Sequence, residues 1–343
     1  MRKVFITGTA GFIGYHLAKH LLQHGFVVRG FDGMTSYYDV ELKRKRHAML
    51  LQNPNFAATE AMLQDVATLD RQIDGFAPDI IIHLAAQAGV RYSLEDPRSY
   101  VDSNIVGTFN VLEAARRVSP AHLMIASTSS VYGANPSLPF RETDKADHPL
   151  TTYAATKKAG EALAHSYAHL WSISTTMFRF FTVYGTWGRP DLAYFKFVKA
   201  ILQGEPIDVY NNGDMWRDFT AVADLVEAVR LLVDVPPVRP LPDSDVEAGD
   251  SLSPVAPFRV VNIGASEKLY LMDVIAAIEA AVGRKADCRF LPMQKGDAPA
   301  TWADTGLLRR LTGFSPKISL SDGMAEVVAW YDEKLTRLGN RVI

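Results

Sequence analysis

Three glycines near the N-terminus constrain the fold of this chain more than any other feature. They follow the apolar run Val4-Phe5-Ile6 and are spaced Gly8-x-x-Gly11-x-x-Gly14. Apolar residues then recur at helical spacing between positions 15 and 22. Glycine lets the backbone turn tightly and approach a phosphate, and the N-terminus of the following helix offers free N–H groups. A strand, a glycine turn and a helix in this order predict a dinucleotide-binding site.

A carboxylate supports this interpretation. The second predicted strand, residues 26–31, ends at Asp32. A carboxylate about 20 residues beyond such glycines accepts hydrogen bonds from the adenosine ribose hydroxyls and repels a 2′-phosphate. No arginine follows Asp32, because the next residue is Gly33. The sequence therefore favours NAD over NADP, whereas the glycine spacing taken alone would also fit an ordinary strand–turn–helix.

Composition narrows the class of protein. The 343 residues are 48% hydrophobic and 22% charged, as in a soluble enzyme with a sizeable core. The net charge of −2 gives no reason to expect a nucleic-acid or membrane-surface partner. Cys288 is the one cysteine, so no internal disulfide can form, and the histidines lack ligand spacing, so no metal site is predicted. The apolar run after Arg2 and Lys3 is too short for a signal peptide, and no stretch could cross a bilayer, so we expect a cytoplasmic protein.

Strand and helix patterns alternate through the first half of the chain. We expect strands at 3–7, 26–31, 56–62, 79–84, 122–127 and 173–180, and helices at 11–24, 39–51, 97–118 and 151–170. Several of these strands are almost entirely apolar, as strands buried on both faces of a parallel sheet are. The pattern predicts an α/β fold with a doubly wound parallel (Rossmann) sheet. We interpret the basic run from Lys43 to His47 as a solvated helix face.

The second half is less regular and predicts a smaller C-terminal α/β substrate-binding domain. Residues 1–181 are assigned to the NAD-binding domain, to which the chain returns near 219–234 and 258–263, and residues 182–343 mainly to the second domain. Helices are expected at 191–203, 221–233, 270–282 and 319–338. The segment 236–257 is rich in proline and acidic residues and predicts a flexible surface insertion.

A tyrosine and a lysine carry the predicted chemistry. Tyr153 and Lys157 lie four residues apart in a predicted helix, so their side chains share one face. A free phenol has a pKa near ~10, and bringing it to neutrality costs about 4 kcal/mol. A nearby ammonium lowers that pKa by favouring the phenolate. Taken alone, the spacing also fits an amphipathic helix face, so it gains meaning only beside a dinucleotide site.

These residues belong to a longer series of motifs. With them, the chain resembles the extended short-chain dehydrogenase/reductase family, specifically its NAD-dependent nucleotide-sugar epimerases. The resemblance is strongest to UDP-glucuronate 4-epimerases, through residues 83–93, 178–191 and 291–297 (HLAAQAGVRYS, FRFFTVYGTWGRPD and LPMQKGD). The other matching pieces are Gly8-x-x-Gly11-x-x-Gly14, Asp32, Asp65-Val66, Asn104, Ser127 to Gly133, Tyr153-x-x-x-Lys157 and Arg217-Asp218-Phe219.

The resemblance implies a role for each matching residue. The catalytic residues would be Thr128, Tyr153 and Lys157, with Tyr153 as the acid/base. The NAD-binding residues would be Gly8, Ala10, Gly11, Phe12, Ile13, Gly14, Asp32, Asp65, Val66, Leu84, Ala85, Ala86, Asn104, Tyr153, Lys157 and Phe180. The UDP-sugar-binding residues would be Arg91, Ser129, Ser130, Thr182, Arg189, Tyr210, Arg217 and Gln294.

Two of the substrate residues leave alternatives open. Gln294 stands where related sugar epimerases often have an arginine, and Lys295 and Thr186 stand where close relatives tend to have proline. Arg91 fits either a substrate contact or a loop charge.

The resemblance implies a 4-epimerase that interconverts UDP-glucuronate and UDP-galacturonate through a 4-keto intermediate, for polysaccharide precursor synthesis. The family usually forms homodimers, and the helices at 97–118 and 151–170 are the candidates for that contact.

The alternative functions are those of a UDP-glucose/UDP-galactose type epimerase and a UDP-glucuronate decarboxylase. Decarboxylases and 4,6-dehydratases of the family carry acidic residues where this chain has Ser129 and Ser130. A non-catalytic NAD-binding module has no need of Thr128, Tyr153 and Lys157 together.

Overall fold

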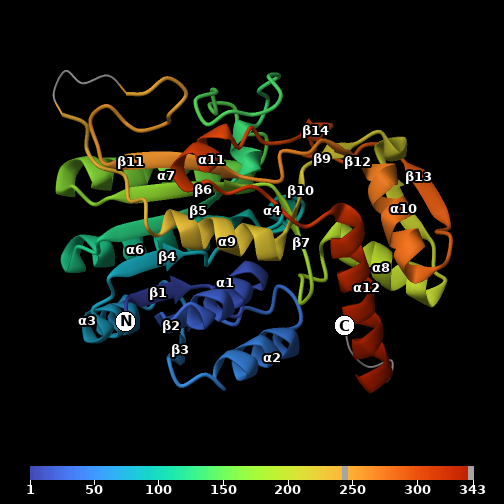
Figure 1. Cartoon of the computed structure of the whole chain (residues 1–343), viewed down its shortest axis with the longest axis horizontal. Coiled ribbons are helices and arrows are strands. Elements are labelled where there is room, and N and C mark those ends of the chain that lie inside the picture. The colour runs from blue at the N-terminus through green and yellow to red at the C-terminus, as the bar shows by residue number, and fades with distance from the viewer. Residues whose placement is uncertain (242–245, 339–343) are drawn as a thin grey trace.

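Seven parallel strands form the centre of the molecule (Figure 1). The computed structural model describes residues 1–241 and 246–338. The strands follow the order β11-β6-β5-β4-β1-β2-β3, so the chain reverses direction across the sheet between β1 and β4. Their bounds are β1 Lys3–Thr7, β2 Val27–Asp32, β3 Phe56–Glu60, β4 Ile80–His83, β5 His122–Thr128, β6 Thr175–Phe180 and β11 Phe258–Ile263.

Helices cover both faces of this sheet, because the side chains of each strand alternate between two apolar cores. On β1, Val4 and Ile6 pack into one core and Phe5 into the other. The first core lies under α1 Phe12–Gln23, α2 Val40–Leu50, α9 Val222–Leu232 and α11 Gly306–Thr312. The second lies under α3 Val66–Phe76, α6 Gly107–Val118 and α7 Thr152–Trp171. The predicted doubly wound parallel fold is confirmed.

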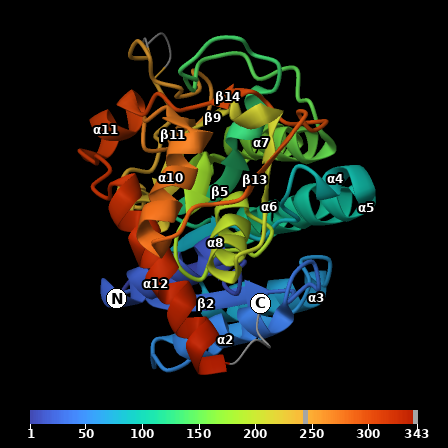
Figure 2. The ribbon, with the colours of Figure 1, turned by 90° about the vertical axis from the view of Figure 1, so that its right-hand side faces the viewer.

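A third apolar core lies at one end of the sheet, on the right of Figure 1. It is enclosed by α8 Ala193–Gln203, α10 Leu271–Val282 and α12 Leu320–Leu338. β8 Ile207–Tyr210 pairs in parallel with β13 Cys288–Leu291 against these helices. Figure 2 looks onto this group, with α12 in front of the sheet.

Short elements connect the sheet to this third core. β7 Thr182–Tyr184 pairs with β10 Phe219–Ala221, and β9 Trp216–Arg217 lies between β12 Leu269–Tyr270 and β14 Ala300–Thr301. The remaining short helices are α4 Tyr92–Glu95, α5 Pro97–Tyr100, η1 Val101–Val106, η2 Ser129–Tyr132 and η3 Asn211–Gly213. Within the described ranges, no helix is both long enough and apolar enough to span a membrane.

The segment expected to be a flexible insertion, 236–257, is described except for residues 242–245, which lie outside the described residues. Its last part contacts the sheet and α7. Asp250 accepts two hydrogen bonds of 2.9 Å from the Arg259 guanidinium on β11. The Ser253 hydroxyl lies 2.8 Å from Nε2 of His165 on α7. These contacts attach residues 250–253 to the Rossmann sheet.

Candidate active site

A cavity of about 920 Å³ lies between the carboxyl ends of the sheet strands and the third core. This is where open α/β sheets bind their ligands, because the chain reverses direction there. The cavity is lined by most of the predicted site residues: Gly8, Gly11, Phe12, Ile13, Gly14, Asp32, Leu84, Ala85, Ala86, Arg91, Thr128, Ser129, Ser130, Tyr153, Lys157, Phe180, Thr182, Arg189 and Tyr210. Six predicted residues are not part of its lining: Ala10, Asp65, Val66, Asn104, Arg217 and Gln294.

The glycine turn forms one end of the cavity and has room for a phosphate only because it lacks side chains. Gly8 has a φ of 84°, and a Cβ there would lie 2.7 Å from the backbone nitrogen of Ala85. A Cβ at Gly14 would lie 2.0 Å from the carbonyl oxygen of Gly8. Helix α1 begins after Gly11 without a capping side chain, so its first amides face the turn. Such amides and the helix dipole suit a pyrophosphate.

Asp32 is fixed beside this turn at the end of β2. Its carboxylate accepts hydrogen bonds of 2.9 Å from the backbone N–H groups of Ala10 and Met34. Ala10 thus acts through its backbone on Asp32 and does not line the cavity. Each carboxylate oxygen can accept a further hydrogen bond, so the Asp32 side chain can also take the hydroxyls of a ribose.

The three predicted catalytic residues lie together on the cavity wall. Thr128 ends β5, and its hydroxyl accepts a 3.2 Å hydrogen bond from the N–H of Ser130. Tyr153 lies in the first turn of α7, which Thr151 caps by accepting a hydrogen bond from the N–H of Ala154. Lys157 lies one turn further on, buried, with its side chain lining the same cavity. The fold brings a strand end and a helix start together at this point.

Burial and two neighbouring groups shift the pKa of Tyr153 in opposite directions. Burial raises the pKa of Tyr153, while the hydrogen bond with Thr128 and the positive charge of Arg189 lower it. Burial also lowers the pKa of Lys157 to about 8, against the opposing effect of Glu161. The positive charge of Arg189 therefore favours the Tyr153 phenolate.

Arg189 is held in place by a carboxylate and a phenol. Its guanidinium forms two hydrogen bonds to Asp191, of 3.1 and 2.9 Å. The Tyr37 hydroxyl donates to the same carboxylate at 3.1 Å. Tyr37 follows β2 and Arg189 precedes α8, so this contact joins the nucleotide end of the cavity to the substrate end. Neither Tyr37 nor Asp191 was predicted as a site residue, although Asp191 ends the matching segment 178–191. Tyr37 has no signal in the sequence apart from its proximity to Asp191 in the fold.

The mouth of the cavity carries a second arginine cluster. Arg91 forms a 3.1 Å ion pair with Asp297, and its guanidinium lies 4.6 Å from the centre of the Tyr210 ring. All three residues line the cavity. Arg91 thus lies on the cavity lining with its side chain 47% exposed, and both interpretations, a substrate contact and a loop charge, stay open.

Asp65, Val66 and Asn104 lie beside the cavity instead of lining it. Asp65 caps α3 by accepting a 3.1 Å hydrogen bond from the N–H of Thr68, and Val66 begins that helix with 45% of its surface exposed. Met62, Leu63 and Gln64 line the cavity instead. Asn104 pairs with both backbone groups of Gln87, at 2.9 and 3.0 Å, from the π-helical turn η1. It supports a cavity loop from behind.

Arg217 and Gln294 also lie beside the cavity instead of lining it. The Arg217 guanidinium donates to the carbonyl oxygens of Ala298 and Pro299, at 2.6 and 3.2 Å, and so fastens the loop that carries Asp297. Gln294 lies at the start of that loop, and its carbonyl accepts from the N–H of Asp297. Both residues shape the mouth of the cavity through the backbone.

The interpretation of the basic run 43–47 as a solvated helix face is wrong. Lys43, Arg46 and His47 are buried, and Arg46 is 0% exposed. Arg46 donates to the carbonyl oxygens of Ala10, Trp187 and Gly188, at 2.8, 2.6 and 3.0 Å. It thereby ties the glycine turn to the loop that carries Arg189. These three backbone carbonyls offset part of the cost of burying the Arg46 charge.

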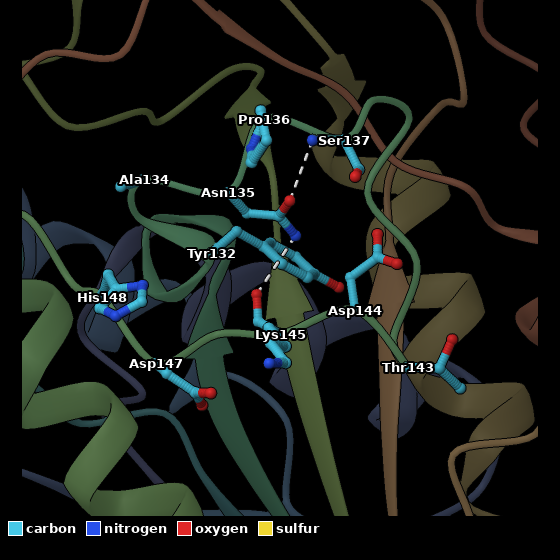
Figure 3. Close-up of a pocket in the computed structure, with 10 residues that line it drawn as sticks. All are labelled: Tyr132, Ala134, Asn135, Pro136, Ser137, Thr143, Asp144, Lys145, Asp147 and His148. Carbon is cyan, nitrogen blue, oxygen red and sulfur yellow. Dashed lines mark hydrogen bonds between the residues drawn. The ribbon is translucent and has the colours of Figure 1, made fainter.

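Two other features of the described chain lie apart from this site. A smaller cavity of about 420 Å³ lies under the loop 134–148 (Figure 3). Asn135 crosses it, accepting from the N–H of Ser137 and donating to the carbonyl of Lys145. Among the described residues, His20, His24 and Glu227 could together hold a metal, but Glu227 already forms an ion pair of 2.6 Å with Arg230. Neither feature contains a predicted site residue.

Comparison with known proteins assigns the family. Residues 4–241 match the family model described as NAD dependent epimerase/dehydratase family. The chain belongs to the NAD dependent epimerase/dehydratase family. Within it, the chain is 56% identical over 335 residues to a probable UDP-glucuronate 4-epimerase of Rhizobium meliloti (strain 1021), with 98% of each chain covered. The family predicted from the sequence motifs is confirmed.

Solved structures agree with this assignment. The fold matches UDP-glucuronic acid 4-epimerase from Bacillus cereus, crystallised with UDP-glucuronic acid and NAD, at a TM-score of 0.83 and 30% identity, over 97% of this chain and 99% of that one. A dTDP-glucose 4,6-dehydratase from Streptomyces venezuelae reaches a TM-score of 0.84 at 23% identity, over 98% and 99%. The fold is thus common to members with different reactions, and the site residues must distinguish them.

Proposed function

We propose that this protein is an NAD-dependent UDP-glucuronate 4-epimerase, which interconverts UDP-glucuronate and UDP-galacturonate. One observation carries the proposal: Thr128, Tyr153 and Lys157 line the same cavity as the glycine turn, and the two residues after Thr128 are serines. From the family resemblance we expect an acidic pair at this place in 4,6-dehydratases and a glutamate in UDP-glucuronate decarboxylases, and this chain has neither. The named epimerases that resemble this chain over nearly its whole length support the same substrate.

The residues present fit NAD. The glycine turn and the start of α1 would hold the pyrophosphate, Asp32 the adenosine ribose, and Lys157 the nicotinamide ribose. When bound, NAD supplies the hydride acceptor and donor that the reaction requires. Tyr153 takes the proton from the 4-hydroxyl group and returns it to the same oxygen after the 4-keto sugar has turned its other face toward the site of hydride transfer. Thr128 orients that hydroxyl group through the hydrogen bonds at the end of β5.

The sugar carboxylate needs its own contacts. Oxidation at carbon 4 makes a β-keto acid, which loses carbon dioxide when the carboxylate bond stands perpendicular to the carbonyl plane. An epimerase must hold the carboxylate away from that geometry. Ser129, Ser130 and Thr182 are small hydroxyl donors on the cavity wall, each able to contribute about 1 kcal/mol net. Arg189 adds a planar pair of donors suited to a carboxylate.

Substrate selectivity distinguishes this proposal from its nearest alternative. Incubation of the purified protein with UDP-glucuronate, UDP-glucose and UDP-xylose, followed by chromatographic resolution of the products, should give fast turnover of UDP-glucuronate alone. Preferential turnover of UDP-glucose would instead support a UDP-glucose/UDP-galactose type epimerase.

The cofactor preference is a second expected result. NAD should bind at least about tenfold more tightly than NADP, because a 2′-phosphate would place like charge against Asp32, and each 1.4 kcal/mol of repulsion is worth tenfold. Titration of both cofactors by calorimetry measures this ratio. In Asp32→Asn the ratio should shift toward NADP. Equal binding of the two cofactors by the unaltered protein would contradict the assignment.

A homodimer is part of the proposal. Val106, Phe109 and Trp171 expose 40%, 44% and 44% of their surfaces on η1, α6 and α7, the predicted contact helices. Burying them between two copies would remove apolar surface from water. We expect a dimer by sedimentation velocity and a shift to monomer in Phe109→Asp. A monomeric unaltered protein at micromolar concentration would refute this part. The cytoplasmic location expected from the sequence stays a prediction.

A further inference from the structure

A buried carboxylate lies directly behind the reacting groups. Glu161 follows Lys157 by four residues and Tyr153 by eight on α7, so the three share one helix face. Its side chain is 4% exposed. The carboxylate accepts four hydrogen bonds: 2.7 Å from the Ser127 hydroxyl, 2.9 and 2.8 Å from the Arg179 guanidinium, and 3.1 Å from Lys158. These donors saturate both carboxylate oxygens.

The partners of Glu161 belong to three different elements. Ser127 precedes Thr128 on β5, and Lys158 follows Lys157 on α7. Arg179 lies on β6, where its guanidinium lies 4.6 Å from the centre of the Tyr132 ring. Glu161 therefore fastens the end of β5 to the first turns of α7. The distance between Thr128 and Tyr153 depends on that junction.

Glu161 also opposes the effect of burial on Lys157. Burial lowers the pKa of Lys157 to about 8, and the negative charge of Glu161 opposes that effect. His83 on β4 is neutral, because burial lowers its pKa to about 3. The titratable and charged groups around Lys157 are Tyr153, Lys158 and Glu161 on its own helix, His83 on β4, Arg179 on β6 behind Glu161, and Arg189 with Asp191 on the cavity wall.

We infer that Glu161 is a positioning residue of the reaction, whose carboxylate holds Lys157 as an ammonium and keeps Thr128 opposite Tyr153. The inference rests on the proposed function, in which Lys157 holds the nicotinamide ribose and donates to it as an ammonium. It goes beyond that function by placing part of the chemistry in a residue that does not line the cavity. A buried ion pair that only stabilised the fold would leave the charge of Lys157 unchanged.

The sign of the effect separates the two roles. The Lys157 ammonium is present below its pKa and is lost as the pH rises through it. Removing the negative charge in Glu161→Gln lowers that pKa, so the basic limb of the pH–activity profile should move to lower pH. Removing the opposing positive charge in Arg179→Met, while Ser127 and Lys158 still bind the carboxylate, should move the limb to higher pH.

The experiment compares initial rates of product formation from UDP-glucuronate between pH 6 and 9.5 at saturating NAD. Glu161→Gln should shift the basic limb to lower pH by about one unit. The ratio of the unaltered rate to the variant rate should therefore grow about tenfold between pH 6.5 and pH 8.5. In Glu161→Asp, which keeps the charge, the basic limb should lie close to that of the unaltered protein. Glu227→Gln breaks a similar ion pair on α9, remote from the cavity, and should leave the profile unchanged.

The inference would be overturned if the basic limb of the pH–activity profile stayed in place in both Glu161→Gln and Arg179→Met. It would also be overturned if the two variants moved that limb in the same direction. If Glu161→Gln does not fold, the direction of the shift in Arg179→Met still tests the inference. Lys158→Met removes a second cation beside Glu161, whose side chain is 35% exposed, and should also move the basic limb to higher pH. An unaltered protein without activity on any UDP-sugar would refute the proposed function instead. An active protein with unshifted variants would refute only the role of Glu161.

Discussion

Replacement of Tyr153 by phenylalanine is expected to lower kcat by about 10²–10⁴-fold, the usual contribution of general acid–base catalysis. The ring stays in place beside Tyr100, whose ring centre is 6.0 Å away, so the shape of the cavity changes little. NAD should still bind, because the glycine turn and Asp32 are unaltered. Initial rates with UDP-glucuronate and a cofactor titration measure the two effects separately.

The matched control lies on the same helix. Tyr167→Phe removes a hydroxyl that donates to Glu113 on α6, far along α7 from the cavity. It should leave kcat within about twofold and cost about 1 kcal/mol of stability. Near-normal turnover in Tyr153→Phe would remove Tyr153 from its catalytic role, whatever the control shows.

Substitution of Gly14 by alanine is expected to weaken NAD binding by roughly 10²-fold. The new Cβ would lie 2.0 Å from the carbonyl oxygen and 2.7 Å from the carbonyl carbon of Gly8, and both are backbone atoms. The turn must therefore shift, which moves the amides away from the pyrophosphate. One or two charge-assisted hydrogen bonds are then lost, at about 1.5–3 kcal/mol each. Isothermal titration with NAD measures the loss.

Gly75→Ala is the matched control for Gly14→Ala, because the same substitution is expected to be harmless there. Gly75 lies inside α3, and nothing lies within 4 Å of a Cβ built there. Alanine should raise the free energy of unfolding by about 1 kcal/mol and leave cofactor affinity unchanged. Tight NAD binding by Gly14→Ala would show that the glycine turn does not hold the pyrophosphate.

Much of the fold followed from local patterns. Six strands of the seven-stranded sheet and the helix covering residues 12–23 match the predicted elements closely, because apolar strands and amphipathic helices carry their burial in their own sequence. The seventh strand, β11, was predicted only as a return of the chain to the first domain. Helix α3 was not predicted, although Leu69, Ile73 and Phe76 recur at helical spacing and Asp65 caps it. Its signal was present and could have been found. The two-residue strands β9, β12 and β14 carry no such pattern.

The site was harder to predict for residues whose hydrogen-bond partners are distant in the sequence and meet them only in the folded protein. Arg46 is buried where the carbonyl groups of residues 10, 187 and 188 accept its hydrogen bonds. No residue spacing in the sequence indicates these contacts. Arg217 faces the backbone of residues 298–299 for the same reason. Glu161, in contrast, continues the series of Tyr153 and Lys157 by one more helical turn, so helix periodicity alone could have indicated it.

The central claim is most directly tested by following UDP-glucuronate in real time by proton NMR with the purified protein and NAD. We expect the anomeric signal of UDP-galacturonate to grow until the two sugars reach a stable mixture, with no pentose product. The same mixture should be reached from UDP-galacturonate. A growing UDP-pentose signal, or an unchanged UDP-glucuronate spectrum under conditions where UDP-glucose is epimerised, would contradict it.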